Sequence, residues 1–175
     1  MAQEFSGRKA MGAIGSPVVL VSSAYNGQMN VTTVNMIAGI SFKPPQLCIS
    51  LSHRSFTSFL IEQSREFAVN VVSPVQLDLV RKIGSTSGHK IDKFEEFSIE
   101  HFRGEKTSCP LLSAAHTVLE CEVNPEHTIK VGTQNLYIAN VVAYHEAGKG
   151  YPLYLYHGRY YAIGEQIGSY RPENI

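Results

Sequence analysis

Short runs of β-branched and other apolar residues, separated by turn-forming residues, dominate the hydrophobic pattern of this chain. The first run covers residues 18–23 (VVLVSS) and leads to Asn26-Gly27, a dipeptide that commonly closes a hairpin, so a second strand is expected after it. Residues 47–51 (LCISL), which follow Pro44-Pro45, and residues 66–72 (EFAVNVV) predict two further strands. Later runs of the same kind cover residues 118–123, 127–131, 136–144 and 159–163.

Two segments between these runs have helical rather than strand periodicity. Residues 55–64 (SFTSFLIEQS) carry apolar side chains at helical spacing after Ser55, a residue type that caps helices. Residues 74–83 (PVQLDLVRKI) repeat apolar positions four apart, which predicts a second amphipathic helix. Residues 85–92 (STSGHKID) are rich in turn formers and predict an exposed loop.

Many closely spaced strands with few helices favour a mainly β fold, a small antiparallel barrel, over a doubly wound parallel sheet. A length of 175 residues with 43% hydrophobic content predicts one domain over residues 1–175. The sequence contains neither G-x-G-x-x-G after the first strand nor G-x-x-x-x-G-K-[ST], so the usual glycine loops for nucleotides are not supported.

The charge of the chain is balanced, with fifteen basic and fifteen acidic residues. This balance gives no footprint for nucleic acid or a membrane surface, so an anionic ligand must be held locally. No run reaches the roughly 18 apolar residues of a membrane helix, and the first residues lack the apolar stretch of a secretory signal. A cytoplasmic protein is therefore expected.

The cysteines and histidines predict neither a disulfide framework nor a metal site. Cys48, Cys109 and Cys121 are odd in number and form no C-x-x-C pair, so all three are expected to be buried thiols. The seven histidines are scattered without metal-ligand spacing.

The densest polar cluster lies between a predicted strand and a predicted helix, at residues 50–57 (SLSHRSFT). Four hydroxyl side chains and one guanidinium gather where a helix leaves backbone N–H groups unpaired, an arrangement that suits a phosphate. A helix cap after a polar loop is the alternative, because serine and threonine are common caps.

Two further segments carry polar groups. Residues 30–36 (NVTTVNM) alternate small polar with apolar side chains, which lets a planar ligand approach the backbone, although a half-buried strand with a solvated face has the same pattern. Residues 92–94 (DKF) follow the serine- and glycine-containing loop and offer one cation and one aromatic ring at a mobile position.

Together these segments resemble the flavin reductase-like family, which includes flavoredoxins and the reductase components of two-component monooxygenases. The resemblance covers residues 15–164 approximately and rests on five stretches in this order: NVTTVNMIAGISFKPPQLCISL, SFTSFLIEQSREFAVNVVS, SGHKIDKF, CPLLSAAHTVLECEV and YHGRYYAIG. It implies a six-stranded antiparallel split barrel, a homodimer and a non-covalent flavin near the subunit interface. The short chain and compact phosphate cluster favour FMN over FAD.

The resemblance also implies which residues line the site. Asn30 and the backbone of Thr32, Thr33, Val34, Asn35 and Met36 are expected along the isoalloxazine ring. Ser50, Ser52, Ser55 and Thr57, with Leu51 in the same stretch and Arg54 nearby, are expected at the phosphate. Lys93, next to Phe94, is expected to reach the flavin, and Tyr160 or Tyr161 to line the site from near the C-terminus.

The implied activity is that of an oxidoreductase, in which bound flavin accepts electrons from NAD(P)H or a redox partner and passes them on. Two positions depart from the family pattern. Gln134 stands where many members have a histidine near the nicotinamide, and it cannot carry charge. Met36 stands where an aromatic residue is frequent. Because of Gln134, a non-enzymatic electron-transfer protein and a flavin-delivery protein remain alternatives.

Overall fold

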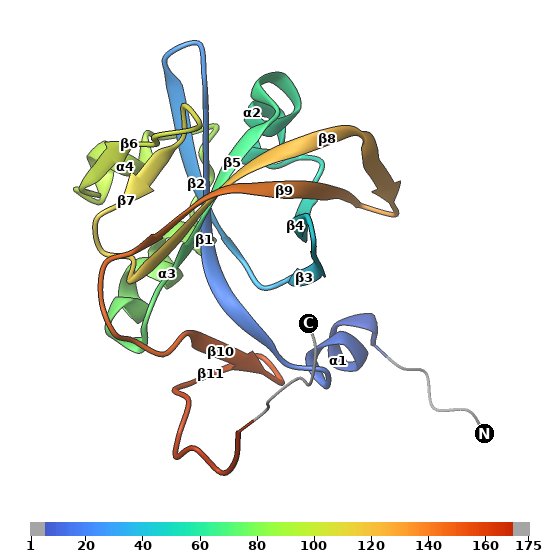
Figure 1. The fold of residues 1–175 in the computed structure, drawn as a ribbon, viewed down its shortest axis with the longest axis vertical. Coiled ribbons are helices and arrows are strands. Elements are labelled where there is room, and N and C mark those ends of the chain that lie inside the picture. The colour runs from blue at the N-terminus through green and yellow to red at the C-terminus, as the bar shows by residue number, and fades with distance from the viewer. Residues whose placement is uncertain (1–5, 170–175) are drawn as a thin grey trace.

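The computed structural model describes residues 6–169, which form eleven strands, four α-helices and one short 3-10 helix (Figure 1). In chain order these are α1 (Gly7–Gly12), β1 (Ser16–Tyr25), β2 (Gln28–Val34), β3 (Ile37–Phe42), β4 (Pro45–Ser52), α2 (Phe56–Ser64), β5 (Glu66–Val71), η1 (Pro74–Gln76), α3 (Leu77–Ser85), α4 (Lys93–Glu96), β6 (His101–Arg103), β7 (Pro110–Leu112), β8 (Thr117–Val131), β9 (Gln134–Glu146), β10 (Leu153–Tyr156) and β11 (Arg159–Tyr161).

Nine of these strands form one antiparallel sheet: eight follow the order β11-β10-β1-β5-β8-β9-β4-β3, and the ninth, β2, pairs with β1. A path of six strands runs from β2 through β1, β5, β8 and β9 to β4. At its two ends β2 and β4 contact each other, but within residues 6–169 no ladder of hydrogen bonds joins them. The predicted antiparallel β fold is therefore confirmed, with more strands than the expected six.

Two hydrophobic clusters lie on the two faces of the curved sheet, and β1 contributes to both. Val19 and Val21 pack in the cluster that β2, β4, β5, β8 and β9 share, which is the inside of the barrel. Val18 and Leu20 point to the other face and pack beneath α3 and the β6–β7 hairpin. This alternation follows from the two-residue period of a strand and explains why residues 18–21 are all apolar.

The structure differs from the predicted elements where a local pattern is interrupted. The expected strands at residues 118–123 and 127–131 are one strand, β8, whose register with β9 shifts between Val123 and Thr128. Pro45 is the first residue of β4, a position where the missing N–H is tolerated. The predicted helix at residues 74–83 begins with η1 and continues as α3 to Ser85. Six elements were not predicted from the sequence: α1, β3, α4, β6, β7 and β10.

Within residues 6–169 no helix is both long enough and apolar enough to cross a membrane. The cytoplasmic location expected from the sequence stays a prediction.

Candidate functional site

One edge of β2 faces the open side of the barrel, and this edge carries the segment predicted to lie along a ring. Among the described residues β2 pairs with β1 alone. The Val31 carbonyl accepts a hydrogen bond from the Lys93 ammonium, so the main-chain groups of Val31 point away from β1. Because these directions repeat every two residues in an antiparallel ladder, the N–H of Thr33 also points to the open edge.

The predicted phosphate segment lies across the open side, on β4 and the loop that follows it. The N–H of Ser50 donates to the Met36 carbonyl over 2.9 Å, which joins the end of the β2 segment to β4. Ser50 and Ser52 are half-buried, whereas the side chain of Leu51 is buried inside the barrel, as is that of Val34. The fold thus brings together two segments whose first residues, Asn30 and Ser50, are 20 positions apart in the sequence.

Asn30 and Thr57 make the direct link between β2 and α2. The Asn30 amide donates to the Thr57 hydroxyl over 2.9 Å, and both side chains are buried. A methyl group at Gly88 would collide with the Asn30 amide, so the loop after α3 approaches Asn30 closely. Thr57 was expected to hold a phosphate; in the structure its buried hydroxyl accepts a hydrogen bond from Asn30, and the phosphate contact stays a prediction.

The start of α2 does not have the cap that the alternative interpretation requires. Ser55 is the N-cap residue, yet its side chain makes no hydrogen bond to the first turn. The Ser52 hydroxyl accepts a hydrogen bond from the N–H of Arg54 over 3.3 Å, and the Arg54 side chain is exposed. The helix therefore presents N–H groups, a serine hydroxyl and an exposed guanidinium at one place, as an anion site does.

Lys93 and Phe94 do not lie at a mobile position, so this part of the prediction is wrong. The Lys93 side chain is 2% exposed, and its ammonium donates to the carbonyls of Val31 and Ile83, each over 2.9 Å. Burial lowers the pKa of Lys93 to about 8, so the group is still mostly protonated at neutral pH. Phe94 is buried in the outer core against His101. Lys93 therefore links β2 to α3, and Phe94 is a residue of the outer hydrophobic core.

Of the two candidate tyrosines, Tyr160 lies beside β2. Tyr160 and Thr33 line the same surface depression of about 580 Å3, and the Thr33 hydroxyl donates to the Val80 carbonyl on α3. Tyr161, on the opposite face of β11, lies near Tyr156 with 6.4 Å between ring centroids. The structure thus favours Tyr160 over Tyr161 as a residue near the candidate site.

Gln134 begins β9 and lies directly opposite Ser52 in the ladder between β4 and β9. Its amide donates to the Thr133 hydroxyl over 3.4 Å, and the Thr133 carbonyl accepts from the N–H of His53. The position singled out for a nicotinamide contact therefore adjoins the predicted phosphate segment. Of the remaining candidates, Thr32 is half-buried in β2, and the Asn35 amide donates to Ser16 over 3.3 Å.

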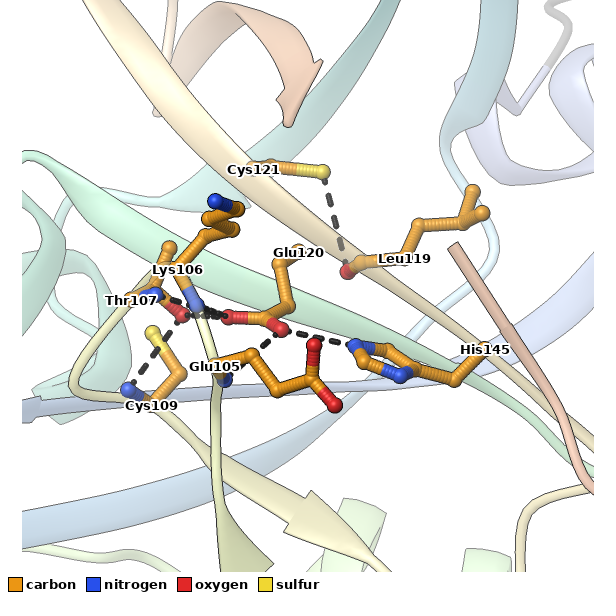
Figure 2. Close-up of polar contacts among 8 residues, drawn as sticks. All are labelled: Glu105, Lys106, Thr107, Cys109, Leu119, Glu120, Cys121 and His145. Carbon is orange, nitrogen blue, oxygen red and sulfur yellow. Dashed lines mark hydrogen bonds and ion pairs between the residues drawn. The ribbon is translucent and has the colours of Figure 1, made fainter. Parts of the chain in front are cut away.

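A second polar cluster, centred on Glu120, was not predicted from the sequence (Figure 2). The Glu120 carboxylate is fully buried and accepts hydrogen bonds from the main-chain N–H groups of Glu105, Lys106 and Thr107. The Thr107 hydroxyl and His145 add two more, at 2.8 and 2.7 Å. Burial alone raises the pKa of Glu120, but the bonds from His145 and Thr107 outweigh it and hold the pKa at about 2.

Two of the three cysteines are buried thiols as predicted. Burial raises the pKa of Cys109 to about 12 and raises that of Cys121 as well, which leaves both in the unreactive thiol form. Cys48 is half-buried, so the prediction for this residue is wrong. Its side chain lies on the opposite face of β4 from Leu47 and Ile49, which pack inside the barrel. In the part of the chain described by the structure, no three potential ligands gather as a metal site.

The fold and the site define a small antiparallel split barrel with polar segments on β2 and β4, the two strands at its open side. The chain belongs to the flavin reductase-like domain family, whose model matches residues 11–164. It is 27% identical over 156 residues to the FMN reductase (NADH) RutF 2 of Rhizobium rhizogenes, covering 89% of this chain and 87% of that protein. It is 25% identical over 134 residues to a high molecular weight rubredoxin of Moorella thermoacetica, covering 76% of this chain.

A flavoredoxin from Methanosarcina acetivorans has the same fold, with a TM-score of 0.84, 20% identity and coverage of 97% of this chain and 95% of that one. Not all relatives match over their full length. The match spans 57% of the Moorella protein and 63% of an uncharacterised Archaeoglobus fulgidus protein that is 30% identical over 113 residues, or 65% of this chain.

Proposed function

We propose that this chain is an FMN-dependent oxidoreductase of the flavin reductase or flavoredoxin type, and that residues 1–175 form one flavin-binding domain. The observation that carries the proposal is that two polar segments lie on either side of the opening of the barrel. One is the free edge of β2, and the other is the start of α2, where Ser55 makes no capping bond. Family membership and the relatives named FMN reductase (NADH) support this function.

The phosphate of a flavin fits the start of α2. Arg54 is exposed and free to turn toward an anion, and the hydroxyls of Ser52 and Ser55 stand on either side of it in the sequence. The first-turn N–H groups of this nine-residue helix add a partial positive charge. These groups suit the single phosphate of FMN, and a related split barrel from Thermus thermophilus is described as an FMN-binding protein.

The ring of a flavin fits the free edge of β2. When bound, the flavin supplies a ring that accepts two electrons and passes them on. The chain supplies the orientation: the outward N–H of Thr33 can donate to the pyrimidine edge and stabilise negative charge there. Lys93 holds the backbone that carries this N–H, because its ammonium binds the Val31 carbonyl on the same strand. Its positive charge also stabilises negative charge on a ring along this edge.

The proposed electron donor is NAD(P)H or a reduced redox partner. Because Gln134 is polar but cannot carry charge, electron transfer between protein partners is the second candidate function. The visible spectrum of the purified protein, with mass analysis of what is released on denaturation, tests flavin binding and distinguishes FMN from FAD. Anaerobic bleaching by NADH or NADPH supports the reductase, and bleaching only by a reduced partner supports the carrier. If no donor bleaches the protein, the reductase and the electron-carrier functions are both contradicted, and a flavin-delivery protein is favoured.

We also propose that the chain acts as a homodimer. β3 ends the strand order of the sheet, so one of its edges has no partner among the described residues. Phe42 and Ile40 on this strand are 76% and 48% exposed, and the preceding Met36 is 47% exposed. A second copy that covers β3 would bury this apolar edge and complete the site beside it. Light scattering is expected to give twice the mass of one chain, and a monomer with full flavin occupancy would contradict the proposal.

A further inference from the structure

A surface depression next to the free edge of β2 carries two cations and no acidic residue. It measures about 580 Å3 and is lined by Thr33, Arg81, Lys82, Gly84, Ser85 and Tyr160. The Arg81 guanidinium lies 5.6 Å from the centroid of the Tyr160 ring, which holds it at the side of the depression. No ion pair joins Arg81 or Lys82 to any side chain described by the structure.

The end of α3 that borders this depression does not repel an anion as strongly as a bare helix C-terminus does. The carbonyls of Val80 and Ile83 accept hydrogen bonds from Thr33 and Lys93, over 2.8 and 2.9 Å. The Ser85 hydroxyl shares its one proton between the carbonyls of Arg81 and Lys82, at 2.9 and 3.2 Å. Four consecutive carbonyls therefore have side-chain donors that offset their partial negative charge, and one donor is itself a cation.

We propose that this depression binds a phosphate group of the nicotinamide dinucleotide that donates the electrons, an inference that rests on the proposed function. Arg81 and Lys82 supply the charge, and a guanidinium supplies the forked donors that match a phosphate. Thr33 belongs both to β2 and to the depression. A dinucleotide held here by its phosphate therefore reaches a ring that lies along β2. The site is separate from Arg54, which is exposed at the start of α2.

The test compares binding of ADP and of adenosine 2′,5′-bisphosphate to the flavin-loaded protein by calorimetry. The variant Arg81→Gln/Lys82→Gln removes both charges and keeps side-chain length. The control Arg103→Gln/Lys149→Gln removes the same charges from exposed residues elsewhere on the surface. For two exposed charge contacts we expect Kd to rise roughly fivefold in the first variant, with little change in the control. The effect should shrink at high salt, and Arg81→Lys should retain most of the affinity.

Two arms identify the phosphate. Weaker binding of both probes, with a higher KM and unchanged kcat for both NADH and NADPH, assigns the site to the pyrophosphate. Weaker binding of the bisphosphate and a higher KM for NADPH alone assign it to the 2′-phosphate. Equal affinities in wild type and variant overturn the proposal, and so does a loss of FMN affinity in the variant, because the two cations would then hold the flavin. If the wild type bleaches with neither nucleotide, the reductase function fails while the titration still decides the site.

Discussion

His145 Nε2 lies 2.7 Å from Glu120 Oε1, and this contact joins β9 to a carboxylate that is fully buried on β8. The same carboxylate receives three main-chain N–H groups from residues 105–107, so it fixes the loop between β6 and β7 against the sheet. Gly104 is the first residue of this loop and lies where a methyl group would collide with the carboxylate. A buried carboxylate bonded in this way holds a segment without regular structure in place.

Glu120→Gln should destabilise the fold in a manner that depends on pH. The pKa of Glu120 is about 2 in the folded protein against an ordinary value of 4.5, so its contribution is present above pH 4.5 and is lost as the pH falls toward 2. This difference corresponds to about 3 kcal/mol. Urea unfolding at pH 7 and pH 3 should show a large loss at pH 7 and a smaller one at pH 3. The exposed Glu105→Gln is the matched control, and equal losses at both pH values would argue against the assignment.

Arg54→Ala should weaken FMN binding without lowering the melting temperature. A hydrogen bond to a charged group contributes about 1.5–3 kcal/mol, which is roughly ten- to hundredfold in affinity. Fluorescence titration of FMN into the apoprotein measures the change, with the exposed Arg103→Ala as control. An unchanged affinity would remove Arg54 from the phosphate site.

Thr57→Val should weaken flavin binding and also lower stability, because it leaves the buried Asn30 amide without its acceptor. The cost of an unsatisfied buried polar group is about 1–3 kcal/mol. A double-mutant cycle with Asn30→Ala separates this coupling from a direct contact between Thr57 and the phosphate. If the two substitutions have additive effects on unfolding, the hydrogen bond between them contributes little.

Gln134→His should raise the rate of flavin reduction by NAD(P)H without much change in flavin affinity. A histidine adds a partly cationic contact to the incoming nucleotide, and only contacts stronger in the transition state accelerate the step. Anaerobic stopped-flow reduction with NADH and then NADPH measures it. Fast wild-type reduction that the substitution leaves unchanged would show that Gln134 lies outside the substrate pocket.

The sequence predicted those parts of the fold that depend on local pattern. The β1–β2 hairpin follows from an apolar run and Asn26-Gly27, and α2 follows from helical spacing after Ser55. Residues 30–36 could be singled out because small polar side chains alternate with apolar ones there, and residues 50–57 because four hydroxyls and a guanidinium gather where a strand leads into a helix. That these two segments meet across the open side follows from the pairing order of the whole sheet, which local pattern does not contain.

Lys93 and Glu120 show why the rest could not be predicted. The Lys93 ammonium finds its acceptors at Val31 and Ile83, 62 and 10 residues away in the chain, so nothing near it in the sequence indicates burial. Glu120 is a charged residue in an otherwise ordinary strand, and its partners come from a loop 13 to 15 residues earlier and from β9. In both cases long-range contacts stabilise a charge that local composition assigns to solvent.

The attachment of β2 has a consequence for the motion of the chain. β5 has paired strands on both edges, whereas among the described residues β2 is paired only with β1. Its other edge is held by the Lys93 ammonium at the Val31 carbonyl and by side-chain bonds from Asn30 to Thr57 and from Thr33 to Val80. A strand with a ladder on one edge alone can open locally on its other edge without breaking a second ladder. Amide hydrogens on the outer edge of β2 should therefore exchange with solvent faster than those of β5, and a ligand that occupies this edge should slow them.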